Sequence, residues 1–328
     1  ISPKFSKNEE KWVNIVNDHT QAISHKIYID PGDLIEDLDD LIALQGEPFG
    51  SPSIYAQYRV FKKFKDKGII VSLDGQGADE LLAGYNGYPY ARFKSLFSEL
   101  NLGGFSKLFA SIGKRQGKFP IIDLYKALLP GPLGSKVSNF RKNKFCKSFL
   151  NQEFIDGFSK MKPPSEEKIK WGPRFLSGCL KDALMGKNGL VHLLRYEDRN
   201  SMFHSIESRV PFLTTDIAEF ILSLPENYLL SDEGVTKHIF RHAMTDIVPR
   251  EILQRNDKIG FATPDHQWIC SNKSRIENWI QGFSKVPILD SQKSNRYFKK
   301  ICNGHEKMNW SFWRMINYYK WYQINDYN

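Results

Sequence analysis

Four polar side chains just after an apolar run are the first candidates for chemistry in this sequence. They lie in the segment VSLDGQGADELLAGY (residues 71–85) and are Asp74, Gln76, Asp79 and Glu80, with Gly75 and Gly77 between them. Ligands of open α/β sheets bind at the carboxyl ends of the strands, and glycines let the backbone approach a ligand closely. Carboxylates in the first turn of a helix also suit Mg²⁺, which prefers oxygen ligands. The segment therefore favours a magnesium–nucleotide site.

The same residue types also have a purely structural interpretation, and spacing alone leaves both open. Asp is a frequent helix cap, and Gly is a frequent turn residue after a strand. The segment lacks the third glycine of a dinucleotide-binding fingerprint, and the chain contains no G-x-x-x-x-G-K-[ST] phosphate loop. Neither of these two nucleotide motifs can therefore be assigned.

The elements that would position these residues follow from hydrophobic periodicity. Segments 7–24, 30–45 and 53–68 have the apolar spacing of helices, and the third ends at a glycine. Segment 25–30 alternates like a short strand, and segment 69–75 is a continuous apolar run typical of a buried parallel strand. The alternation of helices and strands predicts an α/β layer with a parallel sheet.

After residue 86 the pattern is mainly helical. Helical spacing recurs in segments 172–186, 216–224, 236–248 and 305–325. We therefore expect residues 1–90 to hold the remnant of an α/β nucleotide-binding sheet and residues 91–328 to form a mainly helical lobe. The two parts together would make one domain.

Composition and charge narrow the class of protein. The 328 residues carry a net charge of +9, and residues 111–150 hold nine Lys or Arg against one acid. This stretch matches no nucleic-acid-binding motif, so we interpret it as a solvated face and expect no nucleic-acid partner. The four cysteines lie far apart, which argues against a zinc site and a disulfide framework. With no membrane-length apolar run and no signal-peptide core, we expect a cytoplasmic protein.

Four segments, in this order along the chain, resemble glutamine-dependent asparagine synthetases. The segment LDGQGADELLAGY (73–85) is similar to the aspartate-rich signature of their C-terminal synthetase domain. Residues 36–69 resemble the helix–loop–helix that leads into it, and residues 193–213 and 236–264 resemble the second and third core motifs. One such match is weak, whereas four in the family's order are specific.

The resemblance implies a fold and a reaction. The fold is of the adenine-nucleotide α-hydrolase type, truncated here. The enzymes of this family use ATP and Mg²⁺ to adenylate the side-chain carboxylate of aspartate. Ammonia, released from glutamine by an N-terminal glutaminase domain, then displaces AMP, and asparagine and pyrophosphate are the other products. The resemblance leaves open whether the protein forms a homo-oligomer.

The resemblance also implies a role for individual residues. The expected metal ligands are Asp79 and Glu80, the expected nucleotide-binding residues are Asp74, Gly75, Gly77 and Lys258, and the expected catalytic residues are Gln76, Lys258, Arg195 and Asp198. Lys258 matches a lysine that contacts the phosphates and stabilises developing negative charge. Glu207 and Arg209 are expected to form a structural pair.

Two departures from the family pattern leave alternatives open. The phosphate loop Ser-Gly-Gly-x-Asp-Ser and the glutaminase domain are absent from the sequence, so we expect a fragment that is inactive on its own. Gln76 occupies a position where well-known synthetases carry a Glu, and an amide cannot accept a proton as a carboxylate does. Amidation of another carboxylate, such as a sugar acid in surface-polysaccharide synthesis, a β-lactam-type ring closure, and a catalytically inactive nucleotide-binding module remain alternatives.

Overall fold

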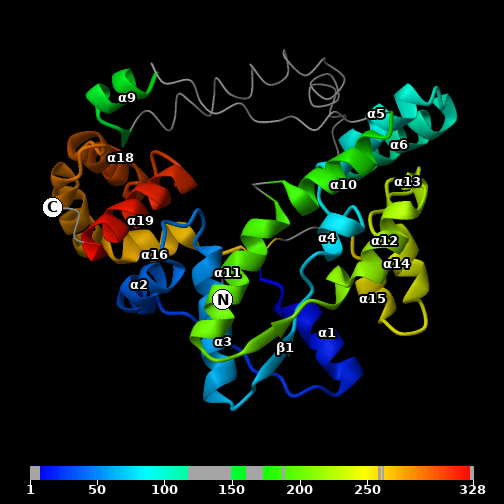
Figure 1. Ribbon diagram of the computed structural model, residues 1–328, viewed down its shortest axis with the longest axis horizontal. Coiled ribbons are helices and arrows are strands. Elements are labelled where there is room, and N and C mark those ends of the chain that lie inside the picture. Colours follow the sequence, from blue (N-terminus) through cyan, green and yellow to red (C-terminus); the bar gives the residue numbers. More distant parts are fainter. Residues whose placement is uncertain are drawn as a thin grey trace.

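A computed structural model of the chain describes residues 8–116, 149–159, 173–186, 189–257, 260 and 262–325 (Figure 1). The first elements are α1 (Glu10–Thr20), α2 (Pro31–Gln45), α3 (Ser53–Asp66), β1 (Val71–Leu73), α4 (Ala78–Leu81), α5 (Tyr88–Ser98) and α6 (Leu102–Gln116). They are followed by α9 (Gln152–Ser159), α10 (Phe175–Met185), α11 (Leu190–Phe203), β2 (Glu207–Arg209), η2 (Pro211–Leu213), α12 (Thr215–Ser223), α13 (Glu226–Leu229), α14 (His238–Ala243) and α15 (Arg250–Leu253). The last are α16 (Asp265–Ser271), α17 (Lys273–Gly282), η3 (Phe283–Lys285), α18 (Ser291–Cys302) and α19 (Trp310–Ile324).

The helices begin and end where their sequences indicate. The Asp30 side chain accepts the backbone N–H of Gly32, Asp33 caps the N-terminus in return, and Pro31 occupies the first turn of α2. Gly46 ends this helix in the left-handed conformation, with φ +68°. The predicted apolar stripe of Leu34, Leu38, Leu41 and Ile42 is buried. The helix therefore forms from local signals and is held by packing.

The described residues form one sheet, of two parallel strands. In it Val71, Ser72 and Leu73 of β1 lie opposite Glu207, Ser208 and Arg209 of β2. The prediction of an α/β protein with a parallel sheet is confirmed, although the sheet is small and helices predominate. The prediction of a strand at 25–30 is wrong, because these residues form no strand ladder. Alternating side chains favour extended backbone, whereas a strand also requires the regular ladder of a paired segment, which the described residues do not provide here.

The prediction that strand 69–75 is buried is also wrong. Val71 is 39% exposed and Leu73 is 75% exposed, whereas Ser72 between them on β1 is buried. A parallel strand is covered on both faces only when helices pack on both sides of the sheet. Within the described part of the chain, β1 is therefore covered on the face that carries Ser72 and open on the other.

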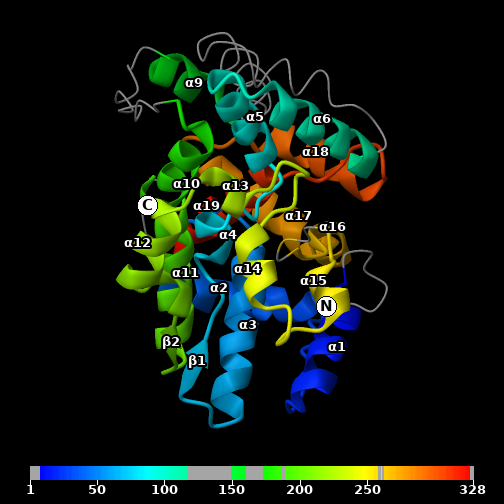
Figure 2. The same ribbon diagram turned by 90° about the vertical axis from the view of Figure 1, so that its right-hand side faces the viewer.

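Two hydrophobic cores hold the helices together. The first joins α2 and α3 to α16, α17, α18 and α19, and the second joins α4, α5 and α6 to α10, α12 and α13. Figure 1 shows them on opposite sides of the molecule, and Figure 2 shows α11 beside the two strands. The first core combines segments from both sides of residue 90, and the expected boundary there stays a prediction. Across the described ranges, no helix is both long and apolar enough to span a membrane.

Candidate active site

The turn between β1 and α4 positions the polar residues of the segment 74–80. The backbone N–H of Asp74 donates to the carbonyl of Arg209 at 2.8 Å, which ties the turn to the end of β2. The backbone N–H of Gln76 donates to Asp74 Oδ1 at 3.1 Å. Gly77 has φ +88°, and a Cβ added there would lie 2.2 Å from Leu213 Cδ2. The turn therefore requires glycine at this position.

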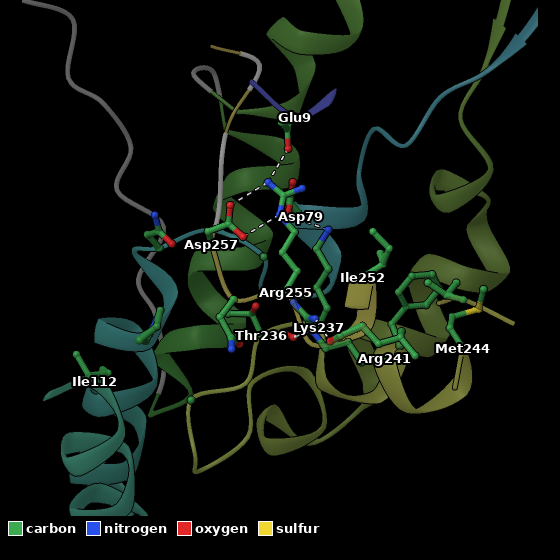
Figure 3. Close-up of a pocket in the computed structure, with 18 residues that line it drawn as sticks. Glu9, Asp79, Ile112, Thr236, Lys237, Arg241, Met244, Ile252, Arg255 and Asp257 are labelled. Carbon is green, nitrogen blue, oxygen red and sulfur yellow. Dashed lines mark hydrogen bonds and ion pairs between the residues drawn. The ribbon is translucent and has the colours of Figure 1, made fainter. Parts of the chain in front are cut away.

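A pocket of about 630 Å³ lies beside α4 and holds Asp79 (Figure 3). Asp79 Oδ1 is 3.0 Å from Lys237 Nζ. Gly84 makes room for this pair, since a Cβ there would lie 1.8 Å from Asp79 Oδ1. Lys237 has φ 53°, a left-handed conformation that costs free energy in any residue except glycine. The ion pair of Lys237 and Asp79 therefore depends on the left-handed backbone of Lys237 and on the absence of a side chain at Gly84.

Two arginines also line this pocket. Arg255 lies between Glu9, at 2.7 Å, and Asp257, at 2.8 Å (Figure 3). Its hydrogen bond holds the pKa of Asp257 below the usual range, despite some burial. Arg241 donates to the carbonyl oxygens of Thr236, at 2.8 Å, and Leu253. With Lys237, these cations balance the three acids that line the described part of the pocket, Glu9, Asp79 and Asp257, so a phosphorylated ligand would compete with those carboxylates for them.

A second, smaller pocket lies on the other side of the same turn. It has a volume of about 350 Å³, and its walls include Ser72, Asp74, Gly75, Gln76 and Tyr196. Burial raises the pKa of Asp74, although the backbone N–H groups of Gln76 and Gly75 oppose this shift. Among the described residues, Asp79 therefore lies in a pocket of three acids and three cations, whereas Asp74 is the one charged residue in the lining of the pocket next to Gln76.

Comparison with known proteins assigns the family of this chain. The family model described as asparagine synthase matches residues 2–323. The chain belongs to the asparagine synthase family. The predicted family resemblance is therefore confirmed.

Individual relatives agree with this assignment at moderate identity. The chain is 24% identical to asparagine synthetase (glutamine-hydrolyzing) 1 of Bacillus subtilis over 316 residues, which cover 90% of this chain and 47% of that protein. It is 23% identical over 261 residues to synthetase 3 of the same organism, with 76% and 36% covered. Human asparagine synthetase is 38% identical over 120 residues, with 33% and 21% covered. The chain spans less than half the length of each of these relatives.

The structure separates the two acids expected to bind metal. Asp79 faces the larger pocket, whereas Glu80 is buried and accepts a short hydrogen bond from the Tyr85 hydroxyl. No group of three or more His, Cys, Asp or Glu side chains in the described residues could hold a metal by itself. Asp79 Oδ1 is shielded from solvent and paired with Lys237, so a Mg²⁺ held by this single carboxylate would need phosphate oxygens and water as its other ligands. The expected metal roles of Asp79 and Glu80 stay predictions.

The residues expected from the second motif lie outside both pockets. Arg195 forms an ion pair with Glu47 and donates to the carbonyl of Gln45 at 3.2 Å, so it links α11 to the end of α2. Asp198 is exposed on the same helix. Lys258 and the side chains of the basic stretch 114–147 lie outside the described residues. The expected pair of Glu207 and Arg209 is confirmed, at 2.8 Å on the exposed surface of β2.

Three residues of this site were missed by sequence reasoning. Lys237 and Arg255 both lie in the third motif, but the family pattern implies a role there only for Lys258. Glu197 is only 2% exposed and contacts the strands from α11. A signal existed for Glu197, because it shares the buried face of α11 with Asn200 and Ser201 at the i+3 and i+4 positions.

Proposed function

We propose that this chain is the synthetase part of an ATP-dependent amidotransferase that makes asparagine. ATP and aspartate would bind at the carboxyl end of β1, the aspartate side chain would attack the α-phosphate, and ammonia would displace AMP from the acyl-adenylate. The observation that carries the proposal is the pair of Asp79 and Lys237 in the larger pocket, together with the match to the asparagine synthase family model.

Cations in the larger pocket would stabilise the departing pyrophosphate. Negative charge grows on the bridging and terminal phosphate oxygens as the bond to the α-phosphate breaks, and fixed cations stabilise it without reorganisation. Lys237 and Arg255 would offer such charges as the phosphates replace their acidic partners, and the family motif implies the same role for Lys258. Asp79 would hold the Mg²⁺, which supplies further charge neutralisation at the phosphates. Lys237 then both orients Asp79 and faces the phosphates.

The smaller pocket suits the acyl-adenylate, with its nucleotide part against Gly75 and its acyl end towards Gln76. Gly75 has no atom within 4 Å of an added Cβ, so the backbone there is open to a ligand. Gln76 offers an amide that donates and accepts hydrogen bonds. We assign Asp74 and Gly77 to shaping this turn between the two pockets. We also propose that glutamine is the nitrogen source, hydrolysed in a glutaminase domain of the kind that the relatives' names imply, and that the reaction takes place in the cytoplasm.

The test is isotope exchange between pyrophosphate and ATP, measured with the protein that carries this chain at its full natural length. Aspartate and Mg²⁺ should both be required. Asp79→Asn should lower the exchange rate about 10²–10³-fold, as the loss of one preorganised charge contact does. Asp39→Asn is the matched control. Asp39 also pairs with a lysine, Lys320 at 2.9 Å, but it is exposed on α2 and does not line the pocket.

Two results would contradict the proposal. Exchange that is equally fast in Asp79→Asn and the unaltered protein would remove Asp79 from the phosphate site. Exchange that depends on a different carboxylic acid and not on aspartate would show that asparagine is not the product.

A further inference from the structure

A buried carboxylate lies directly behind the turn that carries Gln76. Glu197 of α11 is 2% exposed, and its Oε1 accepts a short hydrogen bond from the Ser208 hydroxyl on β2. Its Oε2 is also shielded from solvent and has no hydrogen-bond partner among the described residues. An unsatisfied buried carboxylate oxygen is costly, so this position calls for a donor.

The surroundings of Glu197 contain one side chain suited to that role. Burial raises the pKa of Glu197, and the nearby Asp74 adds to this effect, whereas Ser208 and the side chain of Gln76 lower it. The geometry agrees, because the turn that carries Gln76 is bonded to Arg209 by the N–H of Asp74 at 2.8 Å, and Glu197 accepts from the preceding residue, Ser208. The amide group of Gln76 carries two N–H donors, while Asp74 can offer only another negative charge. Gln76 also lines the smaller pocket, where its side chain can meet a bound ligand.

We propose that Glu197 is a positioning residue for Gln76. Its carboxylate accepts a hydrogen bond from the Gln76 NH₂ group and thereby turns the amide oxygen towards the smaller pocket. The proposal rests on the function given above, because the ligand met by that oxygen is the incoming ammonia. In synthetases that carry Glu at this position, one carboxylate would accept hydrogen bonds from the N–H groups of ammonia. Here Gln76 and Glu197 together would provide that oxygen acceptor.

The physical consequence is an oriented and strengthened acceptor. An amide can rotate so that either its oxygen or its NH₂ group faces the pocket, and only the oxygen can accept from ammonia. A carboxylate behind the NH₂ group selects the productive orientation. It also polarises the amide, which makes its oxygen a better acceptor. Glu197 never touches the reacting atoms and acts only through Gln76.

The experiment compares three variants by a structural readout and a kinetic one. Glu197→Met removes the acceptor at similar size, Glu197→Gln keeps one acceptor oxygen, and Glu207→Gln is the control, a nearby exposed carboxylate on β2. The structural readout is the ¹⁵N–¹H resonance of the Gln76 side-chain amide, assigned by its loss in Gln76→Ala. The kinetic readout separates the KM for ammonium in AMP release from the rate of pyrophosphate exchange, which reports adenylation alone.

We expect Glu197→Met to shift the Gln76 resonance towards that of a solvent-exposed amide. Its KM for ammonium should rise roughly 10–100-fold, the size of one hydrogen bond to a charged group, with pyrophosphate exchange within about twofold of the original. Glu197→Gln should rescue part of both effects, and Glu207→Gln should change neither.

An unchanged Gln76 resonance in Glu197→Met would overturn the proposal. So would an equal loss of exchange and ammonium use, because that pattern indicates a merely structural carboxylate. If the unaltered protein shows no aspartate-dependent exchange, the proposed function fails instead, and the resonance still decides whether Glu197 holds Gln76.

Discussion

The two glycines of the signature turn should respond in opposite ways to the same substitution. Gly77 has φ +88°, and a Cβ added there would meet Leu213 Cδ2 at 2.2 Å and Cγ at 2.6 Å. Gly75, two residues earlier, has no atom within 4 Å of an added Cβ. Gly77→Ala therefore changes the protein itself, whereas Gly75→Ala changes only the space that a ligand would occupy.

The magnitudes follow from these contacts. An alanine in the left-handed conformation costs about 1–2 kcal/mol, and forcing a methyl group against Leu213 costs about 1–3 kcal/mol more. Gly77→Ala should therefore lower the free energy of unfolding by about 2–5 kcal/mol. Gly75→Ala should leave it within about 1 kcal/mol, because only the entropy of the unfolded chain changes.

The measurement is urea unfolding of both variants followed by circular dichroism, together with calorimetric titration of ATP in the presence of Mg²⁺. Gly75→Ala should keep the unfolding midpoint and lose ATP affinity, since its new methyl group lies in the ligand's path. Equal midpoints for Gly77→Ala and the original chain would refute the steric argument. Unchanged ATP affinity in Gly75→Ala would refute the close approach of backbone and nucleotide.

Three further predictions concern groups outside the pockets. Cys270 and Cys302 have their sulfur atoms 3.1 Å apart, so mild oxidation with diamide should join them and raise the thermal midpoint by several degrees, as closing a loop of this length stabilises by about 3–4 kcal/mol. Arg92→Met should cost about 3–5 kcal/mol in urea unfolding, because it leaves the buried carboxylate of Glu226, now 3.1 Å from the guanidinium, without its cation. Asp37→Asn should destabilise the protein at about pH 6 and much less at about pH 3, as measured by urea unfolding at each pH.

The sign of the last effect follows from the surroundings of Asp37. Burial alone would raise its pKa, but hydrogen bonds from Lys62, Arg59 and Tyr55 outweigh this and hold the pKa below the usual range. A carboxylate with a depressed pKa stabilises the fold above its unfolded-state pKa, and the contribution is lost as the pH falls through the folded-state value. A penalty that grows towards pH 3 would contradict this. In the oxidation experiment, Cys302→Ser should abolish the rise in the thermal midpoint that diamide causes. An Arg92→Met protein as stable as the original would refute the ion-pair argument.

The sequence by itself determined the local elements and the family. The helix at 31–45 follows from its capping residues and from an apolar stripe of period 3.6, both of which act within a few residues. The turn after β1 follows from Gly77, because few other residues adopt its backbone conformation. The order of the four motifs indicated the asparagine synthase family, which the family comparison confirms.

The tertiary structure alone decided which of these elements meet. Nothing in the three residues of β2 marks them as the partner of β1, since a strand so short has no pattern of its own. The expected strand at 25–30 has the right alternation but joins no ladder within the described residues, and the exposure of Leu73 depends on which layers cover the sheet. Periodicity shows which face of an element is apolar, and it does not show what that face contacts.

The same reason explains the candidate site. Asp79, Gly75 and Gln76 could be found from the sequence because one short turn holds them together. Lys237 reaches Asp79 because the start of α14 bonds to Leu82 at the end of α4, and Glu197 reaches β2 because α11 packs against that strand. A charged residue on a helix surface looks the same in sequence whether it faces water or a buried carboxylate. The contact that gives it a role depends on long-range packing, which local spacing does not encode.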